Sequence, residues 1–167
     1  MDKYRVGLFI GRFQPFHKGH LYIIRKALRD YVDSLIIGVG TANRRDSENP
    51  LSFEARKKIL EEVIKNEKWA GKIKTIIPIN DYLESDDIWL QKTTEMTGPF
   101  DAVLGNNEWV NGIFEKAGYP VQRLGYFKRY LYEGEKIRTL AREGKRWENR
   151  VPDYTLRFIL LSFNTLT

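Results

Sequence analysis

Apolar residues follow two alternating patterns along this chain. In short runs they are continuous or occupy every second position, which predicts strands, and in longer stretches they recur every three or four residues, which predicts amphipathic helices. Strands are expected near residues 4–10, 34–40, 73–79, 101–105 and 120–124. Helices are expected near residues 18–31, 52–67, 87–96, 108–118, 134–143 and 153–163. Strands that alternate with helices through short connections predict an α/β fold with a doubly wound parallel sheet of five strands.

The second predicted strand indicates a sheet that is covered on both faces. Residues 35–40 are apolar or glycine without polar alternation, as expected for a parallel strand between two layers of helices. Ser52 can cap the helix that follows, and the apolar residues of 59–64 give that helix one buried stripe. No repeat, low-complexity tract or linker interrupts the pattern. We therefore expect a single domain over residues 1–167, with the C-terminal helices packed beside the carboxyl edge of the sheet.

Composition places the chain among ordinary globular proteins. Of its 167 residues, 42% are hydrophobic and 30% are charged, which is enough apolar material for a core and excludes a disordered chain. No stretch approaches the roughly 20 apolar residues of a membrane span, and the N-terminus lacks the apolar core of a signal peptide. The chain has no cysteine, which excludes disulfides, thiolate metal sites and thiol nucleophiles. We expect a cytoplasmic protein with no membrane partner.

The segment from Gly11 to His20 has the properties of a phosphate-binding loop. Its sequence, Gly-Arg-Phe-Gln-Pro-Phe-His-Lys-Gly-His, directly follows the first predicted strand and leads into the first predicted helix. The N–H groups and the positive dipole end of a helix N-terminus favour a phosphate at this position. His17 and His20 face the same way on the first turn, and Gly19 lets a phosphate approach the backbone. Two surface histidines that only cap the helix are the alternative.

The positive charge of the chain is concentrated in one segment. The formal net charge is +6, and residues 123–150, the basic segment, hold nine lysines and arginines against four glutamates. Such a segment can meet nucleic acid, a membrane surface or a polyphosphate, or it can form a solvated helix face. Interleaved aromatic residues keep a single-stranded nucleic-acid-binding module as a distant alternative; they are Tyr126, Phe127, Tyr130, Tyr132 and Trp147. Beside a phosphate-binding loop, a small polyphosphate explains the charge better, and no nucleic-acid partner is expected.

The ten residues from Gly11 to His20 resemble the nucleotidylyltransferase superfamily, whose mark is His-x-Gly-His. The longer match, Gly-Arg-Phe-Gln-Pro-Phe-His-x-Gly-His, resembles the archaeal-type nicotinamide-nucleotide adenylyltransferases. This resemblance implies a Rossmann-like nucleotidylyltransferase fold and transfer of the adenylyl group of ATP to nicotinamide mononucleotide (NMN), giving NAD and pyrophosphate. It also implies a homo-oligomer, with a hexamer as the assembly of archaeal relatives. The same fold and chemistry with another acceptor, such as phosphopantetheine or flavin mononucleotide (FMN), is the nearest alternative.

Adenylyl transfer needs cations and hydrogen-bond donors rather than a covalent nucleophile. The acceptor phosphate is already an anion near neutral pH, so the protein has to bring two anions together and stabilise charge on the reacting phosphate. His20 is expected to contact the α-phosphate of ATP, and His17 and Arg12 are expected to bind ATP phosphate as well. The resemblance implies phosphate contacts for these catalytic candidates. Three further residues are expected in the ATP-binding loop, Gly11, Phe13 and Gly19.

A second motif lies at residues 132–138. Its sequence, Tyr-Glu-Gly-Glu-Lys-Ile-Arg, resembles the C-terminal motif of the family, Ser-x-Thr-x-Ile/Val-Arg, whose arginine holds the ATP polyphosphate. Ile137 and Arg138 match this motif, which implies ATP binding for both and a catalytic role for Arg138. Glu133 and Glu135 replace the two hydroxyl residues. These glutamates either turn away from phosphate or meet it through Mg²⁺.

Two more positions complete the expected ATP site. Arg129 aligns with a basic position of the family and is a candidate for phosphate. Asn107 ends a Gly-Asn-Asn sequence after the fourth strand, where the family has a Gly-Asn near the adenosine; a turn-forming asparagine pair is the alternative. No His, Asp and Glu cluster has metal-ligand spacing, so no protein metal site is expected. Mg²⁺ is expected to enter with the phosphates of ATP.

The nicotinamide side of the site is carried by less specific residues. The stretch from Asp81 to Trp89 resembles the family segment in which a tryptophan stacks on the nicotinamide ring, and an indole suits a cationic pyridinium. Trp89 can equally belong to the core, because it lies on a helix with one apolar face. Asp81 is expected to help recognise the carboxamide. Gly40 and Thr41 begin a loop that resembles a family segment lining the nucleotide site, and Glu48 stands where that loop of the family carries a basic residue.

Overall fold

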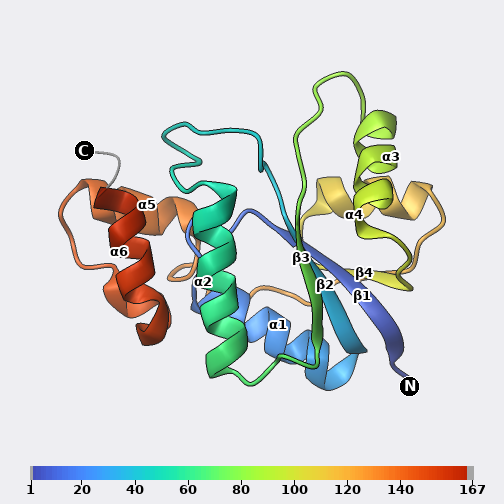
Figure 1. The fold of residues 1–167 in the computed structure, drawn as a ribbon, viewed down its shortest axis with the longest axis horizontal. Coiled ribbons are helices and arrows are strands. Elements are labelled where there is room, and N and C mark those ends of the chain that lie inside the picture. The colour runs from blue at the N-terminus through green and yellow to red at the C-terminus, as the bar shows by residue number, and fades with distance from the viewer. Residues whose placement is uncertain (1, 165–167) are drawn as a thin grey trace.

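Five strands lie parallel in one sheet in the part of the chain that the computed structural model describes, residues 2–164. They are β1 (Tyr4–Gly11), β2 (Val32–Val39), β3 (Ile73–Pro78), β4 (Ala102–Leu104) and β5 (Val121–Gln122). Their order in the sheet is β3-β2-β1-β4-β5 (Figure 1). β1 is therefore central and pairs with both β2 and β4. This order confirms the predicted doubly wound α/β sheet.

Helices cover both faces of the sheet because successive strand residues point in opposite directions. Phe9 of β1 belongs to the core beneath α1 (Lys18–Asp30) and α2 (Phe53–Asn66). Its neighbour Leu8 belongs to a second core beneath α3 (Asp86–Thr97) and α4 (Glu108–Lys116). Figure 1 shows α2 and α3 on opposite sides of the strands. The continuous apolar sequence of β2 follows from this position between two cores.

The C-terminal part of the chain extends the layer formed by α1 and α2. α5 (Gly134–Arg142) is followed by two short 3-10 helices, Glu148–Arg150 and Asp153–Thr155, and by α6 (Leu156–Asn164). α6 packs beside α2 (Figure 1) and contributes Ile159 to the core on that side. The expected C-terminal helices are therefore present, the last with its first turn in 3-10 form. Over the described range 2–164, no helix is long and apolar enough to cross a membrane, and the single-domain organisation stays a prediction.

The carboxyl ends of β1, β2 and β4 bring three loops side by side at one edge of the sheet. The loop after β1 begins at Gly11, whose carbonyl accepts a hydrogen bond from the N–H of Gly40, after β2, at 2.9 Å. The loop after β4 lies on the other side of β1. In doubly wound sheets a crevice opens where the chain leaves neighbouring strands toward opposite faces. The segment with the two histidines lies at this crevice.

Candidate active site

A cavity of about 280 Å³ opens at the carboxyl ends of β1 and β4. Its walls come from the end of β1 and the loop that follows, from the loop after β4, and from the first turns of α5. Most of the residues predicted to bind ATP line it, namely Gly11, Arg12, Phe13, His17, His20, Asn107, Arg129 and Arg138. The fold thus gathers two motifs that are separated by more than half of the chain.

His17 and His20 form a stacked pair at the start of α1. Their ring centres lie 3.6 Å apart, and the ring planes differ by 20°. His17 is the N-cap, and its Nδ1 accepts hydrogen bonds from the N–H groups of Gly19 (3.1 Å) and His20 (3.3 Å). Nδ1 of His20 accepts from the N–H of His17 at 3.2 Å, which completes a capping box built from two histidines. Since a ring nitrogen that accepts carries no proton, both rings have their proton on Nε2.

Both histidines are held in the neutral form. Burial lowers the pKa of His17 to about 3. Burial also lowers the pKa of His20, and the neighbouring His17 lowers it further. At neutral pH each ring is therefore an uncharged imidazole with one N–H, and a proton on Nδ1 would break the cap. The pair offers Nε2–H donors to a phosphate, and the positive charge of the site comes from arginines.

Gly19 makes room for the histidine pair. A Cβ at this position would lie 2.9 Å from the His17 ring and 3.0 Å from the Cβ of Tyr132. The N–H groups of Gly19 and His20 are already bonded to His17. This corrects the expectation that glycine opens these N–H groups to phosphate. The residue is small because His17 and Tyr132 approach it closely.

The loop after β1 presents one charged side chain and hides its aromatic ones. Arg12 is exposed at the cavity, and its Nη1 lies 3.4 Å from Oδ1 of Asn49. Phe13 is only 1% exposed and packs edge-on against His20, with ring centres 4.8 Å apart. A Cβ at Gly11 would lie 2.8 Å from the Phe13 ring, so this glycine permits the packing. Phe13 supports the His20 ring, and Arg12 is the side chain that can meet a phosphate.

Arg138 reaches the loop after β1 from α5. It is 3% exposed, and its Nη1 donates to the carbonyl of Gln14 at 2.8 Å. Its Nη2 donates to the carboxylate of Glu48 at 2.5 Å. In the described part of the chain, Nε of Arg138 is buried without a hydrogen-bond partner. An unpaired buried donor of this kind costs free energy, so the contacts within the described chain leave Arg138 incompletely paired.

Glu48 ties the loop after β2 to α5. Its carboxylate also accepts from Arg142 at 3.2 Å, and Arg142 donates in addition to the carbonyl of Ser47. Hydrogen bonds from Arg138 and Arg142 hold the pKa of Glu48 below its usual range, so the carboxylate is ionised at neutral pH. Sequence reasoning identified position 48 as a departure from the family but did not find this partner. Glu48 therefore contacts the arginine that the sequence predicts for the ATP polyphosphate.

The first turn of α5 also lines the cavity. Glu133 is the N-cap residue, but its side chain makes no cap hydrogen bond. Its carboxylate lies 3.5 Å from Arg129 and 3.2 Å from Lys136. Glu133 is thus paired with cations of its own segment, which is how a carboxylate can be tolerated beside a phosphate site. Ile137 is fully buried in the core, and this anchors the neighbouring Arg138.

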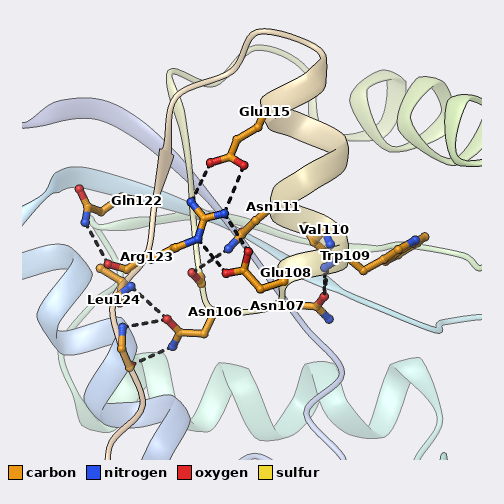
Figure 2. Close-up of polar contacts among 12 residues, drawn as sticks. Asn106, Asn107, Glu108, Trp109, Val110, Asn111, Glu115, Gln122, Arg123 and Leu124 are labelled. Carbon is orange, nitrogen blue, oxygen red and sulfur yellow. Dashed lines mark hydrogen bonds and ion pairs between the residues drawn. The ribbon is translucent and has the colours of Figure 1, made fainter.

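Asn106 and Asn107, the two asparagines after β4, accept hydrogen bonds from nearby backbone N–H groups (Figure 2). Oδ1 of Asn107 caps α4 by accepting from the N–H groups of Trp109 (3.0 Å) and Val110 (3.2 Å). Oδ1 of Asn106 accepts from the N–H of Leu124 at 3.0 Å. Both side chains therefore hold local backbone in place, as the alternative of a turn-forming asparagine pair predicts. Asn107 still lines the cavity, and its amide group is the part that can donate to adenine or ribose.

An ion-pair network fixes α4 to the end of β5. The guanidinium of Arg123 lies between the carboxylates of Glu108 and Glu115, at 2.7 Å from each (Figure 2). Arg123 belongs to the basic segment, yet its charge is directed at α4. The loop that follows places Tyr126, which is 54% exposed, in the cavity wall. Its hydroxyl donates to the carbonyl of Asn106 at 3.2 Å, and the guanidinium of Arg129 lies over one face of its ring at 4.2 Å. Sequence reasoning assigned Tyr126 no role in the ATP site, although the other face of this ring offers a flat surface for adenine.

Other aromatic residues of the basic segment pack on one another. The ring centres of Phe127 and Tyr132 lie 5.8 Å apart, and those of Phe127 and Tyr22 lie 4.2 Å apart, both in stacked arrangements. Stacking between side chains occupies ring faces that would otherwise receive bases. Arg129 and Arg138 line the cavity. The basic segment thus turns two arginines toward the cavity, and the absence of a nucleic-acid partner stays a prediction.

Three residues predicted for the nicotinamide side gather beyond the ends of β2 and β3. Gly40 follows β2, and the next residue, Thr41, donates from Oγ1 to Oδ1 of Asp81 at 3.2 Å. Asn43 makes two hydrogen bonds with the backbone of Asp81, at 2.8 and 3.0 Å. Arg44 lies 3.5 Å from the second carboxylate oxygen of Asp81. These contacts join the loop after β2 to the segment after β3, beside the loop after β1.

Trp89 lies apart from this group, in the core beneath α3 and α4. It is 3% exposed, and its ring packs against Phe114 (5.9 Å between centres) and Trp109 (4.9 Å). Stacking on a nicotinamide ring requires an exposed face, and these contacts leave Trp89 almost none. Trp89 therefore occupies the position of a core residue, which was the alternative to nicotinamide stacking. Trp109, which is 51% exposed, is the member of the pair that solvent reaches.

The sheet order, the histidine pair at the first crossover and the arginines around one cavity define an α/β nucleotidyltransferase. The chain belongs to the cytidylyltransferase-like family, whose model matches residues 8–141. A nicotinamide-nucleotide adenylyltransferase of Archaeoglobus fulgidus is 36% identical over 155 residues, which cover 90% of this chain and 88% of that protein. The corresponding protein of Methanococcus aeolicus is 37% identical over 153 residues, which cover 91% of this chain and 86% of that protein.

Solved structures share the fold. A bifunctional NMN adenylyltransferase/ADP ribose pyrophosphatase from Francisella tularensis superposes with a TM-score of 0.81 at 23% identity, over 96% of this chain and 50% of that protein. The chain spans about half the length of that bifunctional protein. A second structure of it, complexed with AMP and a manganese ion, gives a TM-score of 0.74 over 98% of this chain and 52% of that protein. At this identity the likeness concerns the fold.

Proposed function

We propose that this protein is an enzyme that transfers the adenylyl group of ATP to NMN, giving NAD and pyrophosphate. The observation that carries the proposal is the stacked pair of His17 and His20, which lines one cavity together with Arg12 and Arg138. Archaeal nicotinamide-nucleotide adenylyltransferases that are 36% and 37% identical over about nine-tenths of the chain support NMN as the acceptor.

The ATP phosphates belong between the start of α1 and the start of α5. Nε2–H of His20 donates to the α-phosphate, and Nε2–H of His17 donates to a neighbouring phosphate oxygen. Arg12 and Arg138 supply the positive charge that the neutral histidines lack, and guanidinium groups bind phosphate through paired N–H donors. The uncapped N-terminus of α5 adds backbone donors and a favourable dipole. Asn107, with Tyr126, lies at the part of the cavity that suits the adenosine.

The reaction is an in-line displacement at the α-phosphorus of ATP. A phosphate oxygen of NMN forms a P–O bond as the bond to the bridging oxygen of pyrophosphate breaks, and the electron pair leaves with pyrophosphate. No proton has to be removed, since the attacking phosphate is already ionised. Donors that are fixed before the reaction stabilise charge as it develops without reorganisation. The mutual capping of His17 and His20 provides this fixed geometry.

A divalent metal ion supports this chemistry by neutralising the polyphosphate, and we propose Mg²⁺. Among residues 2–164, no group of three His, Cys, Asp or Glu side chains could hold a metal ion. Mg²⁺ is commonly held by substrate phosphates and water with few protein ligands. In this proposal the metal ion arrives bound to the phosphates of ATP.

Asp81 and Thr41 form the acceptor subsite in this proposal. The Asp81 carboxylate is an acceptor for the N–H₂ group of a carboxamide, and its hydrogen bond with Thr41 fixes the orientation of one oxygen. Gly40 lies next to Gly11 through a backbone hydrogen bond, so this subsite adjoins the ATP-binding loop. Trp89 can stack on the nicotinamide ring only when a face of its own ring is exposed, and that ring is buried in this structure.

Two features of the proposal rest on sequence and family alone. A homo-oligomer, with a hexamer as the expected form, and a cytoplasmic location both stay predictions. Size-exclusion chromatography with light scattering measures the first. A monomer in solution would contradict it.

NAD formation tests the proposed function directly. Purified protein is mixed with ATP, Mg²⁺ and NMN, and NAD is read as the absorbance of NADH after coupling to alcohol dehydrogenase. Stoichiometric NAD and pyrophosphate support the proposal. Pyrophosphate release with phosphopantetheine or FMN, and none with NMN, would keep the reaction and replace the acceptor. No product with any acceptor would reject adenylyl transfer.

A further inference from the structure

Arg56 is a buried arginine between the two loops that carry the substrate sites. It lies in the first part of α2 and is 1% exposed. Sequence reasoning singled out α2 for its apolar stripe and gave Arg56 no role. Arginines are almost never fully buried unless they have partners, so the contacts of this side chain require an explanation.

The guanidinium of Arg56 binds backbone carbonyls from both loops. Its Nη1 donates to the carbonyl of Arg12 at 2.8 Å and to that of Gly40 at 2.7 Å. Its Nη2 donates to the carbonyl of Thr41 at 3.2 Å. Nε is bonded within α2, to the carbonyl of Ser52 at 3.2 Å. One rigid planar group therefore joins the ATP-binding loop after β1 to the acceptor loop after β2.

The positive charge of Arg56 is stabilised by hydrogen bonds to backbone carbonyl oxygens. No ion pair to Arg56 is formed within the described residues 2–164. Burial, together with the charges of Arg12 and Arg45, lowers its pKa to about 10 against the opposing effect of Glu54 and Asp81, and the group is still protonated at neutral pH. Burying a charge without a carboxylate partner is costly, and apolar residues of similar size could fill a purely structural position. The arrangement therefore points to a requirement that packing alone does not explain.

We propose that Arg56 is a positioning residue that fixes the ATP-binding loop and the acceptor loop relative to each other, so that the NMN phosphate and the α-phosphate of ATP are aligned. This inference rests on the proposed function. The three carbonyls turn toward α2, and the rest of each loop is thereby oriented toward its substrate. Displacement of about 1 Å between reacting groups can cost roughly 100-fold in rate while each substrate still binds. The role of Arg56 is thus to set distance rather than affinity.

The test compares Arg56→Gln and Arg56→Lys with a matched control, Arg25→Gln. Gln removes the charge and the planar fork, whereas Lys keeps the charge and can donate to part of the carbonyl set. Arg25 is exposed on α1 and pairs with Glu67 at 2.6 Å, away from both loops. For each variant kcat is measured, together with separate Kd values for ATP and NMN by calorimetry and the Kd for NAD. NAD spans both subsites, so its Kd reports their relative position.

For Arg56→Gln we expect kcat to fall about 100-fold, with the separate Kd values for ATP and NMN changed less than about threefold. The Kd for NAD should rise by a larger factor than either, and Arg56→Lys should recover part of both losses. Equal losses in kcat and in both single-substrate affinities, or unchanged kcat, would overturn the proposal. If Arg56→Gln does not fold, the proposal is decided by Arg56→Lys, in which the Kd for NAD should still rise by a larger factor than the Kd for NMN. An inactive wild-type protein would instead reject the proposed function.

Discussion

The carboxylate of Glu48 lies 2.5 Å from Nη2 of Arg138, across 90 residues of sequence. This contact joins the loop after β2 to the arginine that the family motif assigns to the ATP polyphosphate. In the proposed function, Glu48 and the ATP phosphates therefore compete for one guanidinium.

Replacing Glu48 by Gln should tighten ATP binding. The change removes one negative charge beside Arg138 and keeps the size of the side chain. Because partly exposed ion pairs contribute little, the Kd for ATP should fall by no more than roughly fivefold. Calorimetric titration with ATP measures it. Glu61→Gln, on the exposed face of α2 beside Lys57, is the control and should leave the Kd unchanged; weaker ATP binding by Glu48→Gln would contradict the competition.

Replacing His20 by Ala should lower kcat by about 100- to 1,000-fold, because a fixed donor to the reacting phosphate is lost. His20→Gln keeps an N–H₂ group near the position of Nε2 and should recover part of this rate. Steady-state NAD formation measures kcat, and circular dichroism checks that each variant is folded. Turnover close to that of the wild type in His20→Ala would remove His20 from the catalytic set.

His17 has two functions that substitution can separate. Asn at position 17 keeps an oxygen acceptor for the N–H groups of Gly19 and His20 but lacks the Nε2–H donor. His17→Asn should therefore lose activity without losing the cap. His17→Ala should lose both, and its free energy of unfolding should be lower by a further ~1 kcal/mol. Urea unfolding and NAD formation are measured in parallel; equal stability of the two variants would show that the cap contributes nothing.

The neutral histidines predict that the folded state loses stability in mild acid. The pKa of His17 falls from the ordinary value of 6.5 to about 3 on folding, and that of His20 is also lowered. Below pH 6.5 the unfolded chain therefore binds more protons than the folded chain. The free energy of unfolding consequently falls as the pH falls from 6.5 toward 3, by up to roughly 1.4 kcal/mol per pH unit for each histidine.

Urea unfolding at about pH 7 and about pH 5.5 checks this dependence. Glutamate and aspartate contribute little in this range, since their ordinary pKa values lie lower. His17→Asn removes one of the two groups and should show a shallower loss of stability. The same slope in wild type and His17→Asn would mean that His17 is protonated in the folded state.

Trp89→Ala should destabilise the protein more than it changes ATP binding. Truncation of a buried aromatic side chain costs about 3–5 kcal/mol, and Trp89 is enclosed by Phe114 and Trp109. Trp89→Phe keeps most of the core and isolates any contact with nicotinamide. A Kd for NMN that rises in Trp89→Phe while the Kd for ATP is unchanged would show that Trp89 stacks on the ring. Unchanged values for both would leave it as a core residue.

Much of the fold was predictable because its causes are local. The hydrophobic periodicity of β1, α1 and β2 placed these elements within a few residues of their observed bounds. The histidine pair was also predictable, because three residues of helix bring His17 and His20 to one face. Its chemistry was less so: the neutral state and the bonded N–H of Gly19 follow from the mutual cap.

The sequence by itself determined the elements, their parallel arrangement and the segment that carries the phosphate chemistry, since each depends on spacing within one turn or one strand. Only the tertiary structure decided which groups meet across the sheet edge. It paired Arg138 with Glu48, placed Arg56 on the carbonyls of two loops and buried Trp89. These contacts join residues tens of positions apart, and their geometry is set by how helices and strands pack rather than by any local pattern.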